Sequence, residues 1–409
     1  MSVESQLLDR RAARALAPPV RSRAWAIVGA LSITETVSWG ILYYAFAAFL
    51  TPMRADLGLS TAELTGAFSL GLLVAGVAGI PVGRYLDRHS PRPLMTAGSI
   101  AAVGLVVAWS QVDGLVGFYA LWVAIGVVMA TVLYEPAFTV LAKHFPVAEQ
   151  RRRAMTAMTL VAALASFIFL PLTQALIDAH GWRDALVILA AILAVITVPL
   201  HAFVLRRAPS ASAQPHGAPP AVPAGQALRS GPFWLLSAAF FLASVAGLAM
   251  MVHSIPFLVE RGHSAAFAAF AVGLVGVSQI PGRLLFAPLA ALLPRPAATA
   301  ALFVLIAAGI GVLVSVHATW AVVVGLLLLG MGNGMSTLAR ATSIADLFGS
   351  DAYGTIASMA AFLITAARAV GPVAAAVYAA AFGYVALLWT LVAVTVVAAV
   401  LAYRAALAG

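Results

Sequence analysis

The sequence lacks cysteine altogether and has few charged residues. Without cysteine, neither a disulfide nor a thiolate metal site can form, and the redox compartment leaves no mark on the sequence. Only 9% of the 409 residues are charged, against about 25% in soluble globular domains. Hydrophobic residues make up 63% of the chain. This composition excludes an ordinary soluble domain and indicates a polytopic membrane protein.

The motifs of common enzymes are also missing. The sequence has no Gly-x-x-x-x-Gly-Lys-Ser/Thr phosphate loop, no His-Glu-x-x-His metal helix and no Gly-x-Ser-x-Gly nucleophile turn. We therefore predict no enzymatic activity, no catalytic residues, no metal and no cofactor. The absence of a nucleotide site also argues against primary active transport by this chain.

Twelve apolar stretches dominate the remaining sequence. Each is long enough as a helix to cross a hydrocarbon layer of about 30 Å. Because the stretches are runs of Leu, Ala and Val, they predict helices rather than barrel strands, and we expect an all-α integral membrane protein. The predicted spans are 24–50, 62–83, 94–110, 114–141, 154–177, 185–205, 231–257, 265–288, 297–316, 320–344, 353–380 and 384–404.

The loops between the spans predict the orientation of the chain. The formal charge is +9, but most arginines lie in short loops rather than on one folded surface, which argues against nucleic acid as a partner. One alternate set of loops is rich in arginine, whereas the other holds only Arg54, Arg183 and Arg261. The positive-inside rule then places both termini and the middle loop in the cytoplasm, with the chain spanning the cytoplasmic membrane. Contact of the arginines with anionic lipid is the alternative.

The two halves of the chain resemble each other. Pro91-Arg92-Pro93 recurs as Pro294-Arg295-Pro296, and Gly181-Trp182 recurs as Gly383-Tyr384 at nearly the same offset. Matching loops in register predict a duplication of six helices, so we expect two pseudo-symmetric bundles. The Ala- and Pro-rich loop between them is expected to be a linker. The predicted parts are a cytoplasmic segment 1–23, a bundle 24–205, a linker 206–230 and a bundle 231–405.

Four charged residues lie deep inside the apolar stretches, namely Glu35, Glu135, Arg283 and Arg368. An ionisable group in hydrocarbon is costly unless it faces protein or a water-filled path, so these residues mark helices that line a pathway. The planar guanidinium of arginine matches a carboxylate, which suggests that Arg283 and Arg368 bind an organic anion. The alternative is that each arginine pairs permanently with Glu35 or Glu135.

The acidic residues have alternatives of their own. Glu35 lies midway along the first span with Trp39 and Tyr43 on the same face, and it is either a proton-coupling site or part of a fixed salt bridge. Glu135 lies nearer the cytoplasmic end, where we expect it to serve as a structural partner in gating. Arg340 is expected to reach the cytoplasmic interface or to pair with Asp346.

Several polar and aromatic residues complete the candidate binding set. His253 and Asn333 lie in spans that would border the pathway and can hydrogen-bond a ligand, or bond a neighbouring helix instead. Trp39 and Tyr43, with Tyr44 and Tyr134, would shape an aromatic pocket, or serve as ordinary packing and interface anchors.

The loop after the second span carries the clearest family signal. Gly83-Arg84-Tyr85-Leu86-Asp87-Arg88-His89-Ser90-Pro91-Arg92 resembles the Gly-x-x-x-Asp-Arg-x-Gly-x-Arg signature of the major facilitator superfamily of secondary transporters, with Ser90 in place of the second glycine. The resemblance implies a gating contact in which Gly83 and Asp87 meet a helix end of the other half. It also implies that Arg88 or Arg92 pairs with an acid. The counterpart loop at 287–296 keeps Arg295 but lacks the acid, so we expect a one-sided contact.

Within that superfamily the chain is most similar to monocarboxylate and oxalate/formate carriers. Gly181-Trp182-Arg183 and the position of Arg283 carry this likeness. It implies that Arg283 and Arg368 bind substrate carboxylates. One turn before Arg283 the chain has Gln279 instead of an acid, and near Tyr43 it lacks a lysine, so the proton route of those carriers has no matching residues.

We therefore expect a functional monomer that moves a small organic anion by alternating access, with protons coupled through Glu35 or through the substrate. The substrate-binding set is Arg283, Arg368, Tyr43, Trp39, Gln279, Asn333 and His253. Proton-driven efflux of drugs or other amphipathic compounds, with structural arginines, is the alternative. A non-transporting membrane receptor on the same fold is a third possibility, against which the short loops argue.

Overall fold

The computed structural model describes residues 18–205 and 222–408, and all regular elements in this part of the chain are helices. The predicted segment 1–23 and linker 206–230 fall largely outside the described residues. The first half consists of α2 Pro18–Trp39, the π-helix η1 Gly40–Tyr44, α3 Ala45–Leu57, α4 Thr61–Arg88, α5 Pro91–Trp109, α6 Leu115–Val132, α7 Tyr134–His144, α8 Ala148–Ala162, α9 Ala165–Pro199 and the π-helix η2 Leu200–Val204. The second half consists of α10 Ala224–Ala227, α11 Gly231–Glu260, α12 Ala265–Leu292, α13 Arg295–Ser315, α14 Thr319–Phe348 and α15 Tyr353–Ala408.

The membrane-spanning helices confirm the predicted fold class. Among the described residues, 11 helices are long and apolar enough to cross a membrane. One of them, Ala148–Val204, contains two predicted spans, which join at a sharp turn at Gly181. Most helices run several residues past the predicted bounds. The starts of α4 and α12 agree with the prediction to within one residue, and there Ser60 and Ser264 cap the helices.

Two glycines make equivalent turns in the two halves. Gly181 in α9 has φ 79° and ψ 165°, and Gly383 in α15 has φ 83° and ψ 165°. Backbone with positive φ is open to glycine and strained for other residues. The chain therefore reverses direction at the same point of each half, as expected from a duplicated unit.

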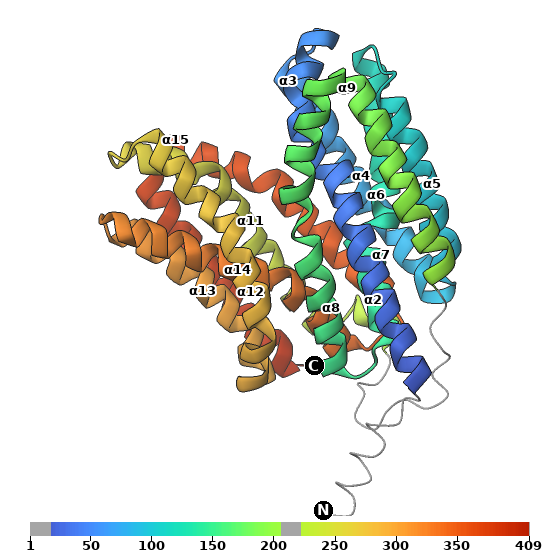
Figure 1. The fold of residues 1–409 in the computed structure, drawn as a ribbon. Coiled ribbons are helices and arrows are strands. Elements are labelled where there is room, and N and C mark those ends of the chain that lie inside the picture. Colours follow the sequence, from blue (N-terminus) through green and yellow to red (C-terminus); the bar gives the residue numbers. More distant parts are fainter. Residues whose placement is uncertain (1–17, 206–221, 409) are drawn as a thin grey trace, which may run out of the picture.

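The helices form two bundles that meet at one end of the molecule (Figure 1). The main contacts between the bundles join α4 and α7 to α15, and α8 to α12 and α14. We call the end with the loops 88–91, 144–148 and 348–353 the arginine-rich face. The end with Gly181, Gly383 and the loop 57–61 is called the opposite face, and the bundles diverge toward it (Figure 1).

Small residues let α4 and α15 approach closely between the bundles. A Cβ at Gly79 would lie 3.9 Å from the Ser358 Cβ, and one at Gly76 would lie 3.3 Å from the Thr365 Cβ. A Cβ at Gly83 would overlap the carbonyl of Gly354. The two bundles are therefore in backbone-level contact near the arginine-rich face, which a larger residue at position 83 would prevent.

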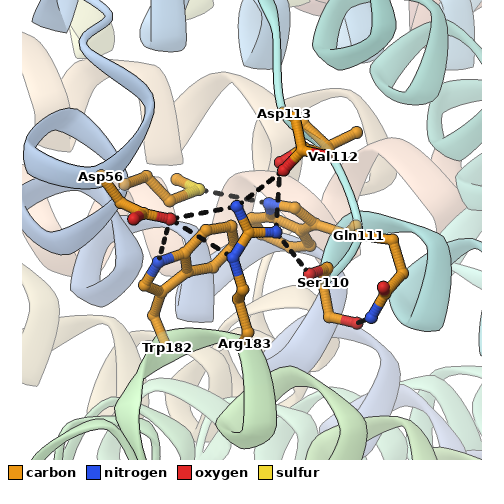
Figure 2. Close-up of polar contacts among 9 residues, drawn as sticks. Asp56, Ser110, Gln111, Val112, Asp113, Trp182 and Arg183 are labelled. Atoms are coloured by element: carbon orange, nitrogen blue, oxygen red, sulfur yellow. Dashed lines mark hydrogen bonds and ion pairs between the residues drawn. The ribbon is translucent and has the colours of Figure 1, made fainter.

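At the opposite face the polar contacts lie within a bundle. Figure 2 shows Arg183, at the start of the second half of α9, between Asp56 of α3 and the end of α5. Its guanidinium donates to the carbonyls of Ser110 (2.7 Å) and Val112 (3.2 Å), and it pairs with Asp56 (3.0 Å) and Asp113 (2.9 Å). The carbonyls at the end of a helix carry partial negative charge, so a cation there fixes the helix terminus.

The second bundle has a comparable contact at the same face. Arg261, just after α11, donates to the carbonyls of Leu313 (2.8 Å) and Val314 (2.6 Å) at the end of α13. In each bundle, then, an arginine ties the end of the third helix of the repeat to a neighbouring helix of the same bundle.

Candidate substrate and gating site

A buried ion pair joins the two bundles near the arginine-rich face. Arg340 of α14 donates to both carboxylate oxygens of Glu135 of α7, at 3.1 and 2.6 Å. Bidentate pairing of this kind is the strongest geometry between these groups. The expectation that Arg340 reaches the interface or pairs with Asp346 is therefore wrong: its partner is Glu135. Glu135 was expected to be a structural partner within reach of the loop that bears Arg88 and Arg92, but the structure pairs it with Arg340 of the other half.

A second ion pair lies beside the first. Arg151 of α8 pairs with Asp346 of α14, and its guanidinium also donates to the carbonyl of Pro146 at 3.1 Å. Arg151 is buried, and so is the neighbouring Tyr353, whose hydroxyl has no hydrogen-bond partner among the described residues. The arginine-rich face is thus closed by two inter-bundle ion pairs.

Asp87 makes the third polar contact between the bundles. Its carboxylate accepts from the backbone N–H groups of Gly354 and Thr355, both at 2.8 Å, and from the Thr355 hydroxyl at 2.7 Å. These groups are at the start of α15, where the helix dipole favours an anion. The structure places Asp87 at a helix end of the other half, where the resemblance put it, and Gly83 one turn earlier gives the close approach.

The remaining gating residues lie around Asp87. Lys143 at the end of α7 lies 3.6 Å from the Asp87 carboxylate and donates to the Leu86 carbonyl at 2.7 Å. Arg88 and Arg92 have exposed side chains at the arginine-rich face. An acid paired with Arg92 is not among the ion pairs of the described residues.

Glu35 is fully buried in α2 and lacks a cationic partner within the described chain. Its Oε2 accepts from the indole N–H of Trp39 at 3.1 Å, and its Oε1 has no hydrogen-bond partner in this part of the structure. A fixed salt bridge to Arg283 or Arg368 is therefore not what the structure shows. A buried carboxyl with one unmet oxygen is costly in its charged form, which keeps a role in proton uptake open.

Aromatic rings continue from Glu35 along the first bundle. Trp39 packs on Tyr134 at 4.9 Å and on Tyr43 at 5.1 Å between ring centroids, and Tyr43 packs on Tyr44 at 5.1 Å. Tyr43 and Tyr44 lie in η1, a π-helical turn of the kind that often occurs at functional sites. The four aromatic residues that were expected to shape a pocket therefore form one connected cluster, and their role in a pocket stays a prediction.

Arg283 crosses from the second bundle to the first. The residue is 7% exposed, and its Nη1 donates to the backbone carbonyl of Thr159 in α8 at 2.7 Å. Its Nε–H is buried without an acceptor among the described residues. Tyr134 and Tyr44 of the first bundle both lie within electrostatic range of this guanidinium.

Arg368 is exposed on α15, although it faces residues of the other bundle. Tyr43, Tyr44 and Glu135 are within electrostatic range of its guanidinium. Counted along their helices, Arg283 lies about 14 Å and Arg368 about 22 Å from the arginine-rich face. Neither arginine has a carboxylate at ion-pair distance within the described residues.

The other predicted binding residues are placed differently. A ring N–H of His253 in α11 is within 3.1 Å of the Pro372 carbonyl in α15, so this side chain already bonds a neighbouring helix. Asn333 in α14 packs against Gly247 of α11, where a Cβ would lie 3.0 Å from its Oδ1. Gln279 is half-buried, one turn before Arg283. The ligand roles of these three residues stay predictions.

Sequence reasoning missed the partners that close the site. Arg340 was expected at the interface, and Arg151 was counted only as one of the arginines of the loops, yet both bridge the bundles. Thr159 left no signal at all, because its backbone carbonyl is the group that acts.

This architecture defines a class of protein: a transmembrane protein of two helical bundles, with charged residues gathered where the bundles meet. The sequence profile of the Major Facilitator Superfamily matches residues 31–372, and the chain belongs to that superfamily. It is therefore a multi-pass membrane transporter of a small molecule, and its relatives are transporters rather than enzymes.

Similar proteins of known name include two carriers. The chain is 27% identical to monocarboxylate transporter 13 of Bos taurus over 78% of this chain and 73% of that protein. It is 28% identical to the oxalate:formate antiporter of Oxalobacter formigenes over 58% of this chain, but spans only 54% of that protein. Among solved structures, the transporter FucP in its outward conformation gives a TM-score of 0.73 at 15% identity, covering 92% of this chain and 98% of that one. The human organic anion transporter MFSD10 gives 0.68 at 16% identity, covering 94% and 100%. At such identities the structural matches show the fold alone.

Proposed function

We propose that this transporter moves a small organic anion, a mono- or dicarboxylate, across the cytoplasmic membrane by alternating access and in company with protons. The chain would work as a monomer, with the bundles 24–205 and 231–405 as the two moving bodies. Its termini and its arginine-rich face would be cytoplasmic.

One observation carries the proposed substrate: Arg283 and Arg368 are cations at the meeting of the bundles without an acidic partner among the described residues. Glu135 is already paired with Arg340, and Glu35 is bonded to Trp39. A guanidinium in such surroundings is stabilised by a carboxylate that binds in its plane. The names of the monocarboxylate and oxalate:formate relatives support the same substrate class.

Glu35 is the proposed proton-coupling residue. It is fully buried, and one of its carboxylate oxygens has no hydrogen-bond partner among the described residues. The ionised form of a fully buried carboxyl is costly, so a proton taken up at Glu35 would relieve the cost of burial.

The proposed gating residues are Gly83, Asp87, Arg88, Arg92 and Glu135. In this structure, contacts across the bundles lie at the arginine-rich face, so the described conformation would be closed to the cytoplasm. Breaking the contacts of Asp87 and Glu135 would then be the step that opens that side.

Proton-driven efflux of amphipathic compounds is the second candidate. The chain is 30% identical to an MFS-type efflux pump of Mycolicibacterium smegmatis over 56% of this chain and 51% of that protein. The connected rings of Trp39, Tyr43 and Tyr44 would suit an aromatic compound. In that case both arginines would be structural.

Uptake into liposomes tests the proposal. The purified protein is reconstituted, and uptake of labelled mono- and dicarboxylates is measured with and without an inward proton gradient. We expect Arg368→Ala to abolish carboxylate uptake and Glu35→Gln to abolish accumulation against a gradient. Arg54→Ala is a matched control, because Arg54 is exposed at the end of α3.

The outcomes separate the two candidates. Normal uptake by Arg368→Ala would remove that residue from the site, and accumulation by Glu35→Gln would exclude Glu35 as the coupling acid. If the wild-type protein takes up no carboxylate, the result favours the second candidate, proton-driven efflux.

A further inference from the structure

The contact between Arg283 and Thr159 joins a proposed ligand-binding side chain to the opposite bundle. We propose that the Thr159 carbonyl is a positioning group that holds the Arg283 guanidinium in its ligand-binding orientation only while the arginine-rich face is closed. The proposal rests on the proposed function, and it makes anion affinity depend on which face is open.

The acceptor is at a helix end. Thr159 lies in the last turn of α8, which ends at Ala162, three residues before α9 begins at Ala165. Thr159 accepts from the N–H of Ala163 at 3.0 Å and uses its second lone pair for Arg283 at 2.7 Å. The neighbouring carbonyl of Val161 accepts from the Thr36 hydroxyl at 3.2 Å. A helix C-terminus carries partial negative charge and favours a cation at this point.

The Arg283 guanidinium has more N–H donors than the Thr159 carbonyl uses. It carries five N–H bonds in a rigid plane, and Nη1 already bonds Thr159. The Nε–H is buried and has no acceptor among the described residues. An unmet buried donor on a charged group is costly, and an anion is the acceptor that would satisfy it best. Because Nε and Nη1 are separate groups, a carboxylate can bond the first while the second keeps the carbonyl.

Opening of the arginine-rich face would separate these groups. Arg283 is on α12 and Thr159 on α8, and α8 meets α12 and α14 of the other bundle. When the bundles separate at that face, the guanidinium loses its bond to the Thr159 carbonyl. The Nε–H is then no longer held in the orientation that binds the anion. Anion affinity then falls in the state that faces the cytoplasm, which favours release to that side.

The absence of native cysteine allows each state to be trapped. The Cβ–Cβ separation of 3.9 Å expected for Gly79→Cys with Ser358→Cys suits a disulfide that holds α4 against α15. Gly83→Leu would instead keep the same helices apart, because its side chain overlaps Gly354. The dissociation constants of formate, acetate and oxalate are measured by calorimetry in both backgrounds.

We expect anion binding to be at least about tenfold tighter in the disulfide-trapped protein than in the Gly83→Leu protein. In Arg283→Lys, which keeps the charge but not the planar fork, this ratio is expected to fall to about one. Leu284→Ala is the control, since Leu284 is exposed next to Arg283, and it should keep the wild-type ratio. An unchanged ratio in Arg283→Lys would overturn the proposal.

A second measurement needs no ligand. Spin labels at exposed positions Arg153 and Asp351 report the separation of the bundles at the arginine-rich face. We expect Arg283→Met to increase the population with the longer distance, because the bond to Thr159 is lost. Unchanged distances would show that the bond does not depend on closure and would overturn the positioning role. A third outcome is possible: Arg283→Met lengthens the distance, but the disulfide-trapped protein with Arg283 intact binds none of the anions. That result would show that the proposed substrate class is wrong and that Arg283 is only a contact between bundles.

Discussion

The two faces of the molecule use the same kinds of charged residue in opposite ways. At the arginine-rich face, Arg340 and Arg151 pair with acids of the other bundle. At the opposite face, Arg183 and Arg261 bond helix ends of their own bundle. One face is therefore held by contacts that must break when the bundles separate, and the other by contacts that survive it.

This difference is what rocking of two rigid bodies requires. Contacts inside each bundle keep the helices together as the bundle moves, whereas contacts between bundles set the relative stability of the two states. Burial strengthens the contrast: the side chains of Arg340 and Glu135 are 11% and 23% exposed, whereas those of Arg183 and Asp113 are 35% and 84% exposed. Loss of a contact at the arginine-rich face should therefore have the larger effect.

The largest expected effect comes from Gly83→Leu. A side chain at this position overlaps the backbone of Gly354, so the arginine-rich face cannot close as described. We expect transport to fall by a factor of about ten or more, since the conformational cycle is blocked. Gly104→Leu is the matched control, because a Cβ at Gly104 meets no atom within 4 Å. Full transport by Gly83→Leu would show that the close approach of α4 and α15 is dispensable.

The next largest effect is expected at the ion pair of Glu135 and Arg340. Glu135→Gln leaves the buried Arg340 without its counter-charge, and breaking a buried pair costs about 3 kcal/mol. Spin-label distances across the arginine-rich face should shift toward the open state. The double variant Glu135→Gln with Arg340→Gln should recover part of the closed population. Additive effects of the two substitutions would show that the side chains do not act as a pair.

Sequence reasoning reached the parts of this comparison that are local in the chain. Asp87 was placed at a helix end of the other half because its motif is contiguous, and the turns at Gly181 and Gly383 follow from the repeat. The partner of Glu135 is 205 residues away, and no spacing in one sequence joins them. The acceptor of Arg283 is a backbone carbonyl, for which every residue type is equivalent. Fold and motif were therefore predictable, whereas the pairing across the bundles was not.

A smaller shift is expected from Asp346→Asn. Asp346 is 25% exposed, and Arg151 keeps its bond to the Pro146 carbonyl when the acid is lost. The remaining acceptor limits the cost to about 1–2 kcal/mol in favour of the open state. The same spin-label pair measures the change, and exchanging the two charges in Arg151→Asp with Asp346→Arg tests whether the pair itself matters. A shift larger than that of Glu135→Gln would reverse the order of the two ion pairs.

The smallest conformational effect is expected from Arg183→Gln at the opposite face. The substitution removes bonds to α5 and to Asp56, all within the first bundle (Figure 2). Exposed ion pairs contribute only about 0–1 kcal/mol each, so the thermal unfolding temperature should fall slightly. The distance between bundles at the arginine-rich face should not change, because no contact across the bundles is touched. Arg261→Gln is the equivalent substitution in the second bundle and should behave in the same way. If either variant opened the arginine-rich face, the bundles would not be moving as independent rigid bodies. The contacts at the two faces would then differ only in the size of their effect on opening.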